Sequence, residues 1–158
     1  MGRTKIVSSK GVSRYSIPKV KPIEFNIFEE LEIEPYLLGL WLGDGTSIGP
    51  RITCDSIDIE EQKKILESIT KNGWTYEIKK YECNKDKRQA EIFIRHEKDK
   101  IDKNGKVCIS WFCEQLRQLG VFNNKHIPEK YLYSSIQDRI DLLCGIYDSD
   151  GYADKNGR

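Results

Sequence analysis

The sequence predicts an α+β fold, and two observations lead to that prediction. A nine-residue apolar segment occurs twice, at 37–45 and 143–151, and its continuous apolar character suits a buried helix. Between the two copies, residues 74–83 and 89–97 alternate between apolar and polar side chains, as strands with one buried face do. Helices combined with a long antiparallel hairpin in one chain belong to the α+β class.

Small residues inside the two repeated segments favour helices over strands. A short apolar run does not by itself distinguish the two structures. Gly39 and Gly43 are four residues apart, as are Gly145 and Ser149, so each pair lies on one face of a helix. Glycine inside a helix costs about 1 kcal/mol relative to alanine, which indicates a packing role. We expect the two faces to pack against each other, because small residues let two backbones approach closely.

Each copy ends in Asp-Gly, which places Asp44 and Asp150 in the last helical turn, with Gly45 and Gly151 in the left-handed position that ends a helix. The helix dipole disfavours a carboxylate there by about 0.3–1 kcal/mol, and two close acids also repel. A divalent cation would relieve both effects, and Mg²⁺ is typically held by one or two carboxylates with water and phosphate oxygens. In the simpler interpretation Asp-Gly only marks a turn. Two aligned copies favour the cation site.

The remaining elements follow from alternation, helical spacing and end signals. The stretch 46–50 contains Gly49 and Pro50 and predicts a degenerate strand at best. The other expected elements, in chain order, are a strand at 51–56, a helix at 58–72, strands at 74–83 and 89–97 joined by a loop at 84–88, a helix at 110–119, a short helix from Pro128, and the second repeated helix, opened by a capping box of Ser135 and Asp138.

Both repeated segments resemble the LAGLIDADG (dodecapeptide) motif of homing endonucleases, and their spacing resembles the two-motif, single-chain members found inside inteins. In that family the motif helices pack at a pseudo-two-fold axis, and their terminal acids bind the metals that cleave DNA. The resemblance implies that Asp44 and Asp150 are catalytic metal ligands, that Gly43 and Ser149 lie in the same metal site, and that Mg²⁺ or Mn²⁺ is the cofactor. The element order is similar to the family's α-β-β-α-β-β-α half, in which a curved sheet follows a DNA groove.

A second local resemblance lies at 120–128, Gly-Val-Phe-Asn-Asn-Lys-His-Ile-Pro. A similar stretch in intein endonucleases carries an active-site lysine, which implies that role for Lys125. A lysine beside the scissile phosphate stabilises developing charge. The alternatives are an exposed loop lysine for Lys125 and a polar loop residue for His126. The sheet face expected to meet DNA carries Lys79, Tyr81, Phe93 and Arg95.

The expected function is therefore Mg²⁺-dependent, site-specific hydrolysis of both strands of double-stranded DNA. The alternatives are a non-catalytic nucleic-acid-binding module, similar to maturases or regulators, and a decayed endonuclease remnant. Three parts are expected: a basic arm or linker at 1–35, a first endonuclease domain at 36–135, and the second motif helix at 136–158 as the start of an incomplete domain. A splicing domain, if the chain derives from an intein, lies outside these residues.

The resemblance places a second sheet-bearing half after the second motif, and only seven residues follow Gly151. The chain alone is therefore expected to bind DNA weakly and to cut it poorly. We expect it to expose an apolar patch that promotes self-association, made of Leu142, Ile146 and Tyr147 or similar residues.

Composition narrows the class of protein further. The net charge is only +1, but the region 71–106 has nine lysines and two arginines against seven acids, a local surplus that suits phosphate binding. The five cysteines form no C-x-x-C pair, so a zinc site is not expected, and an odd count without an apolar leader suits an intracellular protein. No segment is long enough to span a membrane.

Overall fold

A computed structural model describes residues 20–25, 29–55, 63, 67, 70, 73–83 and 87–150. The predicted α+β class is confirmed. Most of the helix predicted at 58–72 lies outside the described residues, as do Gly151 and the side chain of Tyr81. The elements are α1 (Pro35–Asp44), β1 (Arg51–Asp55), β2 (Trp74–Cys83), β3 (Lys87–His96), β4 (Lys100–Ile101), β5 (Val107–Ile109), α3 (Trp111–Gln118), α4 (Glu129–Leu132) and α5 (Ile136–Asp150).

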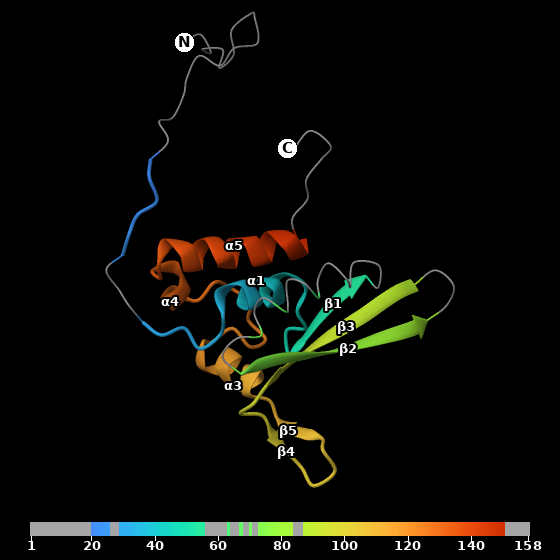
Figure 1. Ribbon diagram of the computed structural model, residues 1–158. Helices are drawn as coiled ribbons and strands as arrows, with labels where there is room; N and C mark the ends of the chain where they lie inside the picture. Colours follow the sequence, from blue (N-terminus) through green and yellow to red (C-terminus); the bar gives the residue numbers. More distant parts are fainter. Residues whose placement is uncertain are drawn as a thin grey trace, which may run out of the picture.

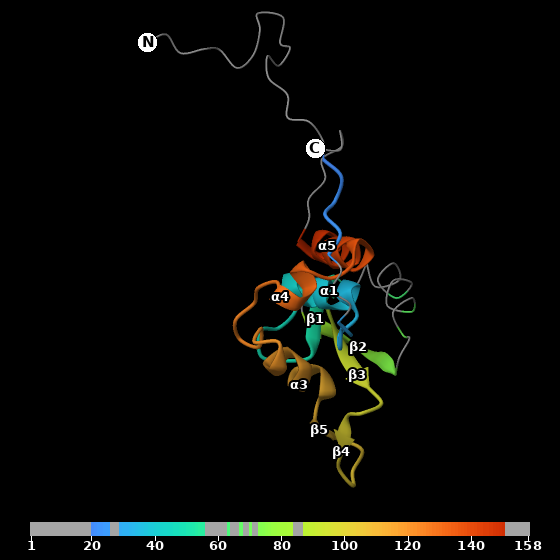
Figure 2. The same cartoon turned by 90° about the vertical axis from the view of Figure 1, so that its left-hand side faces the viewer.

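Helix α1 lies between α5 and a three-stranded sheet, so the described fold has three layers (Figures 1 and 2). The sheet is antiparallel with the order β1-β3-β2, and Ile92 of β3 pairs with Ile52 of β1 and Ile78 of β2. Strand alternation turns one face of the sheet towards α1, because successive side chains point to opposite faces. The core between the layers includes Leu37, Leu38, Trp41, Ile52, Ile92, Ile94 and Leu142.

The long hairpin follows the sequence pattern closely. Strand β2 has the predicted bounds, whereas β3 begins two residues before the predicted position. Cys83 pairs with Lys87, so the connection is shorter than the predicted loop at 84–88. Residues 46–50, where at best a degenerate strand was expected, form a turn and no strand, and an isolated bridge pairs Gly45, just before them, with Ile52.

The C-terminal helices begin and end at the predicted signals. Ser110 caps α3 through its side chain, and Gly120 follows with a φ of 72°. Pro128 immediately precedes α4. At the start of α5 the Ser135 hydroxyl accepts a hydrogen bond from the Asp138 amide at 3.1 Å and donates one to the Asp138 carboxylate at 2.7 Å, which confirms the capping pair. Among the described residues, no helix combines the length and apolar character that crossing a membrane requires.

Two expectations were wrong. Gly45 is not left-handed, because its φ of −71° and ψ of 149° are those of extended backbone. Glycine is needed here for a steric reason, since a Cβ would lie only 2.6 Å from Cγ of Trp41. Leu142 is not exposed: it lies three residues before Gly145, faces α1, and keeps only 2% of its surface accessible. Ile146 is half-buried. The exposed large apolar residues of α5 are Ile140, Leu143 and Tyr147, with 46%, 58% and 58% of their surface accessible.

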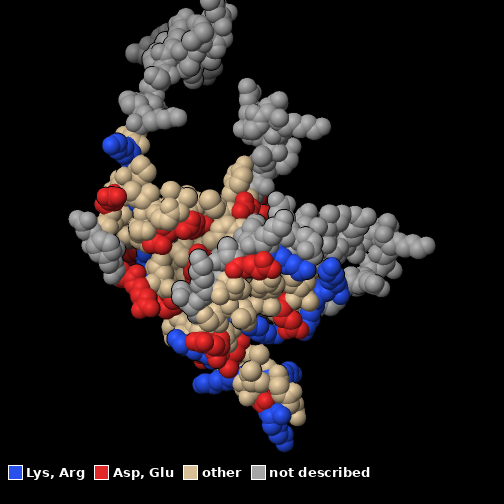
Figure 3. All heavy atoms as spheres, in the orientation of Figure 1, with Lys and Arg blue, Asp and Glu red and all other residues tan. Residues whose placement is uncertain are grey.

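The β4–β5 hairpin was not predicted from the sequence. It projects from the body at the end of the molecule opposite α5 (Figures 1 and 2). Lys100 pairs with Ile109 and Ile101 with Val107. The space-filling view shows basic side chains along this projection (Figure 3).

Candidate active site and basic sheet face

The repeated small residues form the contact between α1 and α5. A Cβ on Gly39 would overlap the carbonyl oxygen of Leu142 and lie 3.0 Å from Cα of Gly145. A Cβ on Gly145 would in turn overlap the carbonyl oxygen of Tyr36 and lie 3.0 Å from Cα of Gly39. The two helix backbones therefore touch directly, and only glycine fits at these two positions.

The same contact continues to the C-terminal ends of the helices, where the acids lie. A Cβ on Gly43 would overlap the Ser149 hydroxyl and lie 3.5 Å from the carboxyl carbon of Asp150. The Ser149 hydroxyl donates to its own helix, with the carbonyls of Gly145 and Ile146 both at 3.0 Å, so it stays folded against α5. The interface thus brings the ends of both motif copies together.

Asp150 lies close enough to Asp44 for its charge to act on the Asp44 carboxyl. Burial raises the pKa of the Asp44 carboxyl, and the negative charge of Asp150 raises it further. The Lys125 ammonium acts in the opposite direction and lowers that pKa. Asp44 is half-buried and Asp150 is exposed, so the pair opens to solvent on the side of Asp150.

Lys125 reaches the same place from the loop before α4. Its Nζ donates a hydrogen bond to the carbonyl oxygen of Gly43 at 2.9 Å and lies 5.2 Å from the centre of the Trp41 ring. Trp41 is fixed in turn, because its Nε1 donates to the carbonyl of Gly49 at 2.9 Å. Burial lowers the pKa of the Lys125 ammonium, whereas the charges of Asp150 and Asp44 raise it. His126 lies exposed beside it, with Nδ1 2.7 Å from the carbonyl of Asn124.

The donor set of this site suits a hard cation that keeps most of its own water. The described residues contain no group of three or more His, Cys, Asp or Glu side chains that could hold a metal. Two neighbouring carboxylates, of which Asp44 has a raised pKa, match the way Mg²⁺ is bound, through one or two carboxylates together with water and phosphate oxygens. The carbonyl of Gly43 is an additional oxygen donor, although Lys125 already donates to it. The residues therefore fit Mg²⁺ or Mn²⁺ and do not form a cage made of protein ligands alone.

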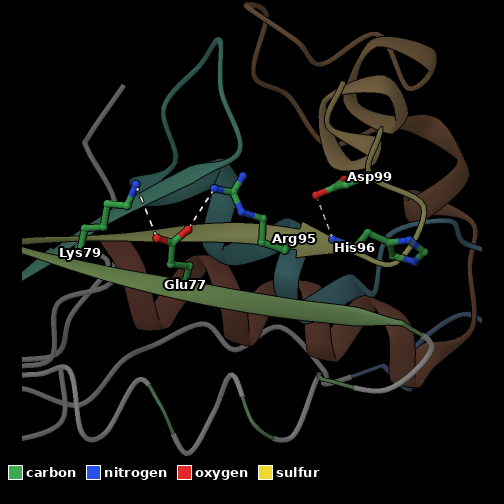
Figure 4. A network of polar contacts seen from close by, with 5 residues as sticks. All are labelled: Glu77, Lys79, Arg95, His96 and Asp99. Atoms are coloured by element: carbon green, nitrogen blue, oxygen red, sulfur yellow. Dashed lines mark hydrogen bonds and ion pairs between the residues drawn. The ribbon is translucent and has the colours of Figure 1, made fainter. Parts of the chain in front are cut away.

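The outer face of the sheet carries the cations and the aromatic ring that the sequence assigned to DNA. Phe93 lies at the centre of this cluster, with Nζ of Lys79 at 4.5 Å and Cζ of Arg95 at 5.5 Å from the ring centroid. Glu77 lies between the two cations, 3.1 Å from Arg95 and 3.6 Å from Lys79, and the hydrogen bond from Arg95 lowers its pKa (Figure 4). The backbone of Tyr81 continues β2 and pairs with Gln89.

The sequence did not indicate two features of these sites: the place of Arg51 in the cluster around Phe93, and a hydrogen bond between α1 and α5. Arg51 lies 5.9 Å from the Phe93 centroid and pairs with Glu91 at 3.2 Å. Arg51 lies on β1, which pairs with β3, and no local sequence pattern connects it to Phe93.

The second feature is a hydrogen bond of 2.8 Å from the Tyr36 hydroxyl to the Asp148 carboxylate, which joins α1 to α5 beside the glycine contact. Burial raises the pKa of Tyr36, and the hydrogen bond to Asp148 raises it further. When the copies at 37–45 and 143–151 are aligned, Asp148 stands at the position of Leu42, and this difference is the signal that could have indicated the hydrogen bond.

A groove of about 760 Å³ extends from this sheet face towards α3 and the β4–β5 hairpin. Five basic residues line it against the single acid Glu114. They come from the sheet, the hairpin and the helix: Arg51, Lys79, Arg95, Lys106 and Arg117.

No protein-family model matches the chain. The chain is similar to the homothallic switching endonuclease of Saccharomyces cerevisiae, with 31% identity over 137 residues that cover 77% of this chain and 22% of that protein. It is also similar to the replicative DNA helicase DnaB of Mycobacterium intracellulare, with 30% identity over 128 residues that cover 81% of this chain and 16% of that protein. The chain thus spans less than a quarter of the length of either relative.

Proposed function

We propose that this chain is part of a site-specific DNA endonuclease of the LAGLIDADG homing type. The observation that carries the proposal is the placement of Asp44 and Asp150 at the ends of two helices in direct backbone contact, with Lys125 beside them. Like charges are not brought together in this way without cost, and a cation with a phosphate would offset that cost. The similarity to an endonuclease over 77% of the chain supports the same activity.

Asp44 and Asp150 would hold Mg²⁺ or Mn²⁺, with the Gly43 carbonyl and Ser149 at the edge of the site. When bound, such an ion polarises phosphate oxygens and supplies an activated water. The protein's part is to fix the two carboxylates, and it does so through the glycine contact between α1 and α5.

Lys125 would stabilise the charge that develops on the phosphate. Its hydrogen bond to Gly43 fixes the ammonium next to Asp44, and its partial burial strengthens its interaction with an anion. Burial lowers the pKa of the Lys125 ammonium, and the negative charges of Asp150 and Asp44 oppose that effect. In the proposed role the lysine serves as a fixed positive charge.

The cluster around Phe93 and the groove beside it would bind double-stranded DNA. Arg51, Lys79 and Arg95 supply positive charge for phosphates and hydrogen-bond donors for base edges. The similarity to a DnaB helicase over 16% of its length supports the intein kind of endonuclease, because an inserted segment would match a small part of a larger host protein. The division into 1–35, 36–135 and 136–158 remains part of this proposal.

The test compares cleavage and binding in the full-length protein that carries these residues. A plasmid library is incubated with Mg²⁺ and cut sites are sequenced, while binding to duplex DNA is measured in Ca²⁺. We expect Asp44→Asn to lower cleavage by about 100-fold or more and to leave binding nearly unchanged. Asp141→Asn, which changes another carboxylate on α5 nine residues before Asp150, is the control and should cut normally. Undiminished cleavage by Asp44→Asn would contradict the proposal, and binding without cleavage by the unaltered protein would favour a non-catalytic nucleic-acid-binding module instead.

A further inference from the structure

We infer that the β4–β5 hairpin is a second DNA-contacting element, which holds the phosphate backbone of the duplex beyond the part that lies on the sheet. The inference rests on the proposed function, because it extends the same DNA-binding surface. The segment 98–109 that contains the hairpin has four lysines and two aspartates. Their contacts determine what charge the hairpin presents.

Both aspartates accept hydrogen bonds from backbone amides, Asp102 within the hairpin and Asp99 at its base. The Asp102 carboxylate accepts from the amides of Asn104 at 2.8 Å and Lys106 at 2.9 Å, which closes the turn in the manner of an Asx-turn. The Asp99 carboxylate accepts from the amide of Trp111 at 2.7 Å and from that of His96 at 3.3 Å, which ties the base of the hairpin to α3 and β3 (Figure 4). The two acids thus build the hairpin and hold it in place.

The lysines are left for an external partner. Lys100, Lys103 and Lys106 are exposed, and none of them forms an ion pair with any residue that the structure describes. Lys98 lies over the Trp111 ring, with Nζ 4.8 Å from its centre. A projecting hairpin with internally bonded acids and outward lysines presents a net positive surface in a fixed geometry, and a fixed geometry reduces the ordering cost of binding.

The hairpin also shares one groove with the sheet. Lys106, Val107 and Cys108 of the hairpin line the same groove as Arg51, Lys79 and Arg95 of the sheet. A duplex on the sheet face would therefore meet the hairpin next. Lysine is a flexible point charge that suits phosphate contacts more than base reading, so the hairpin would add affinity with little sequence preference.

The salt dependence of DNA binding tests this inference. Binding of the full-length protein to random-sequence duplex DNA is measured between about 50 and 200 mM salt, where each lost phosphate contact lowers the slope of log K against log salt by about 0.9. The triple variant Lys100→Gln, Lys103→Gln, Lys106→Gln should lower the slope by about two to three units. The triple change to arginine should keep it, which separates charge from folding. Lys130→Gln is the matched control, because Lys130 is paired with Glu32 at 2.9 Å on α4.

An unchanged slope in the glutamine variant, with normal binding by the unaltered protein, would overturn the hairpin inference and leave the proposed function standing. A failure of the unaltered protein to bind duplex DNA would overturn both.

Discussion

Replacing Gly39 with alanine tests whether the backbone contact between α1 and α5 determines the stability of this fold. The new Cβ would overlap the Leu142 carbonyl oxygen and lie 3.0 Å from Ile146 N, and neither atom can rotate away because both belong to the backbone of α5. The helices must therefore separate. Overpacking costs about 1–3 kcal/mol, and a clash with backbone belongs at the upper end of that range. Alanine recovers about 1 kcal/mol of helix propensity, so we expect a loss of about 2 kcal/mol.

Urea denaturation followed by tryptophan fluorescence measures this loss, because Trp41 lies in the core that the two helices share with the sheet. A loss of that size lowers the midpoint by about 1 M urea. Gly145→Ala should behave alike, and the double variant should lose less than the sum, since both changes widen the same gap. Gly49→Ala is the control, because its Cβ would meet nothing closer than 3.7 Å. A Gly39→Ala variant as stable as the unaltered chain, or a fully additive double variant, would refute this reasoning.

Two further predictions concern charge and the exposed face of α5. In metal-free protein at neutral pH, Asp44→Asn should stabilise the fold by about 0.5–1 kcal/mol, because it removes a carboxylate from a helix C-terminus and from the neighbourhood of Asp150. The pKa of Asp44 is raised on folding, so the folded state binds the Asp44 proton more tightly than the unfolded state does, and stability falls as pH rises. The extra stability of Asp44→Asn should therefore vanish below the ordinary pKa of 3.8. Thermal unfolding at several pH values measures it, and a destabilised Asp44→Asn would contradict it. Leu143→Glu should reduce self-association in sedimentation experiments because Leu143 is 58% exposed in the apolar row with Ile140 and Tyr147. Ile48→Glu, at an equally exposed residue outside α5, should not, and equal sedimentation of Leu143→Glu and the unaltered chain would disprove the role of this face.

The elements with strong periodicity were predictable from the sequence. Alternation fixed β2 and the buried face of β3, and Ser110, Gly120, Pro128 and Ser135 marked helix ends through local chemistry that tertiary packing did not change. The repeated glycines also predicted which helix faces meet, since a small residue in a helix interior has few other reasons to be there.

Very short strands, and the conformation or burial of single residues, were not predicted correctly. The strands β4 and β5 are only two and three residues long and show no alternation, so nothing in 98–109 distinguishes them from a loop. The left-handed assignment of Gly45 failed because the chain turns directly into its bridge with Ile52 in an extended conformation. Leu142 is buried because it shares a helix face with Gly145, three residues later, and that face packs against α1.

Arg51 joined the sheet cluster through strand pairing, which sequence spacing does not reveal. Its partner Phe93 faces it across the β1–β3 ladder, 42 positions further along the chain.

Binding of Mn²⁺ to the full-length protein tests the pairing of Asp44 and Asp150 most directly, because it needs neither a DNA target nor cleavage. Calorimetry or the spin-resonance signal of free Mn²⁺ gives the affinity of the unaltered protein and of three single variants. We predict that Asp44→Asn and Asp150→Asn each weaken Mn²⁺ binding by about tenfold or more, while Asp141→Asn leaves it unchanged. Equal Mn²⁺ affinity in all four proteins would show that the two acids, although packed together, do not form a metal site.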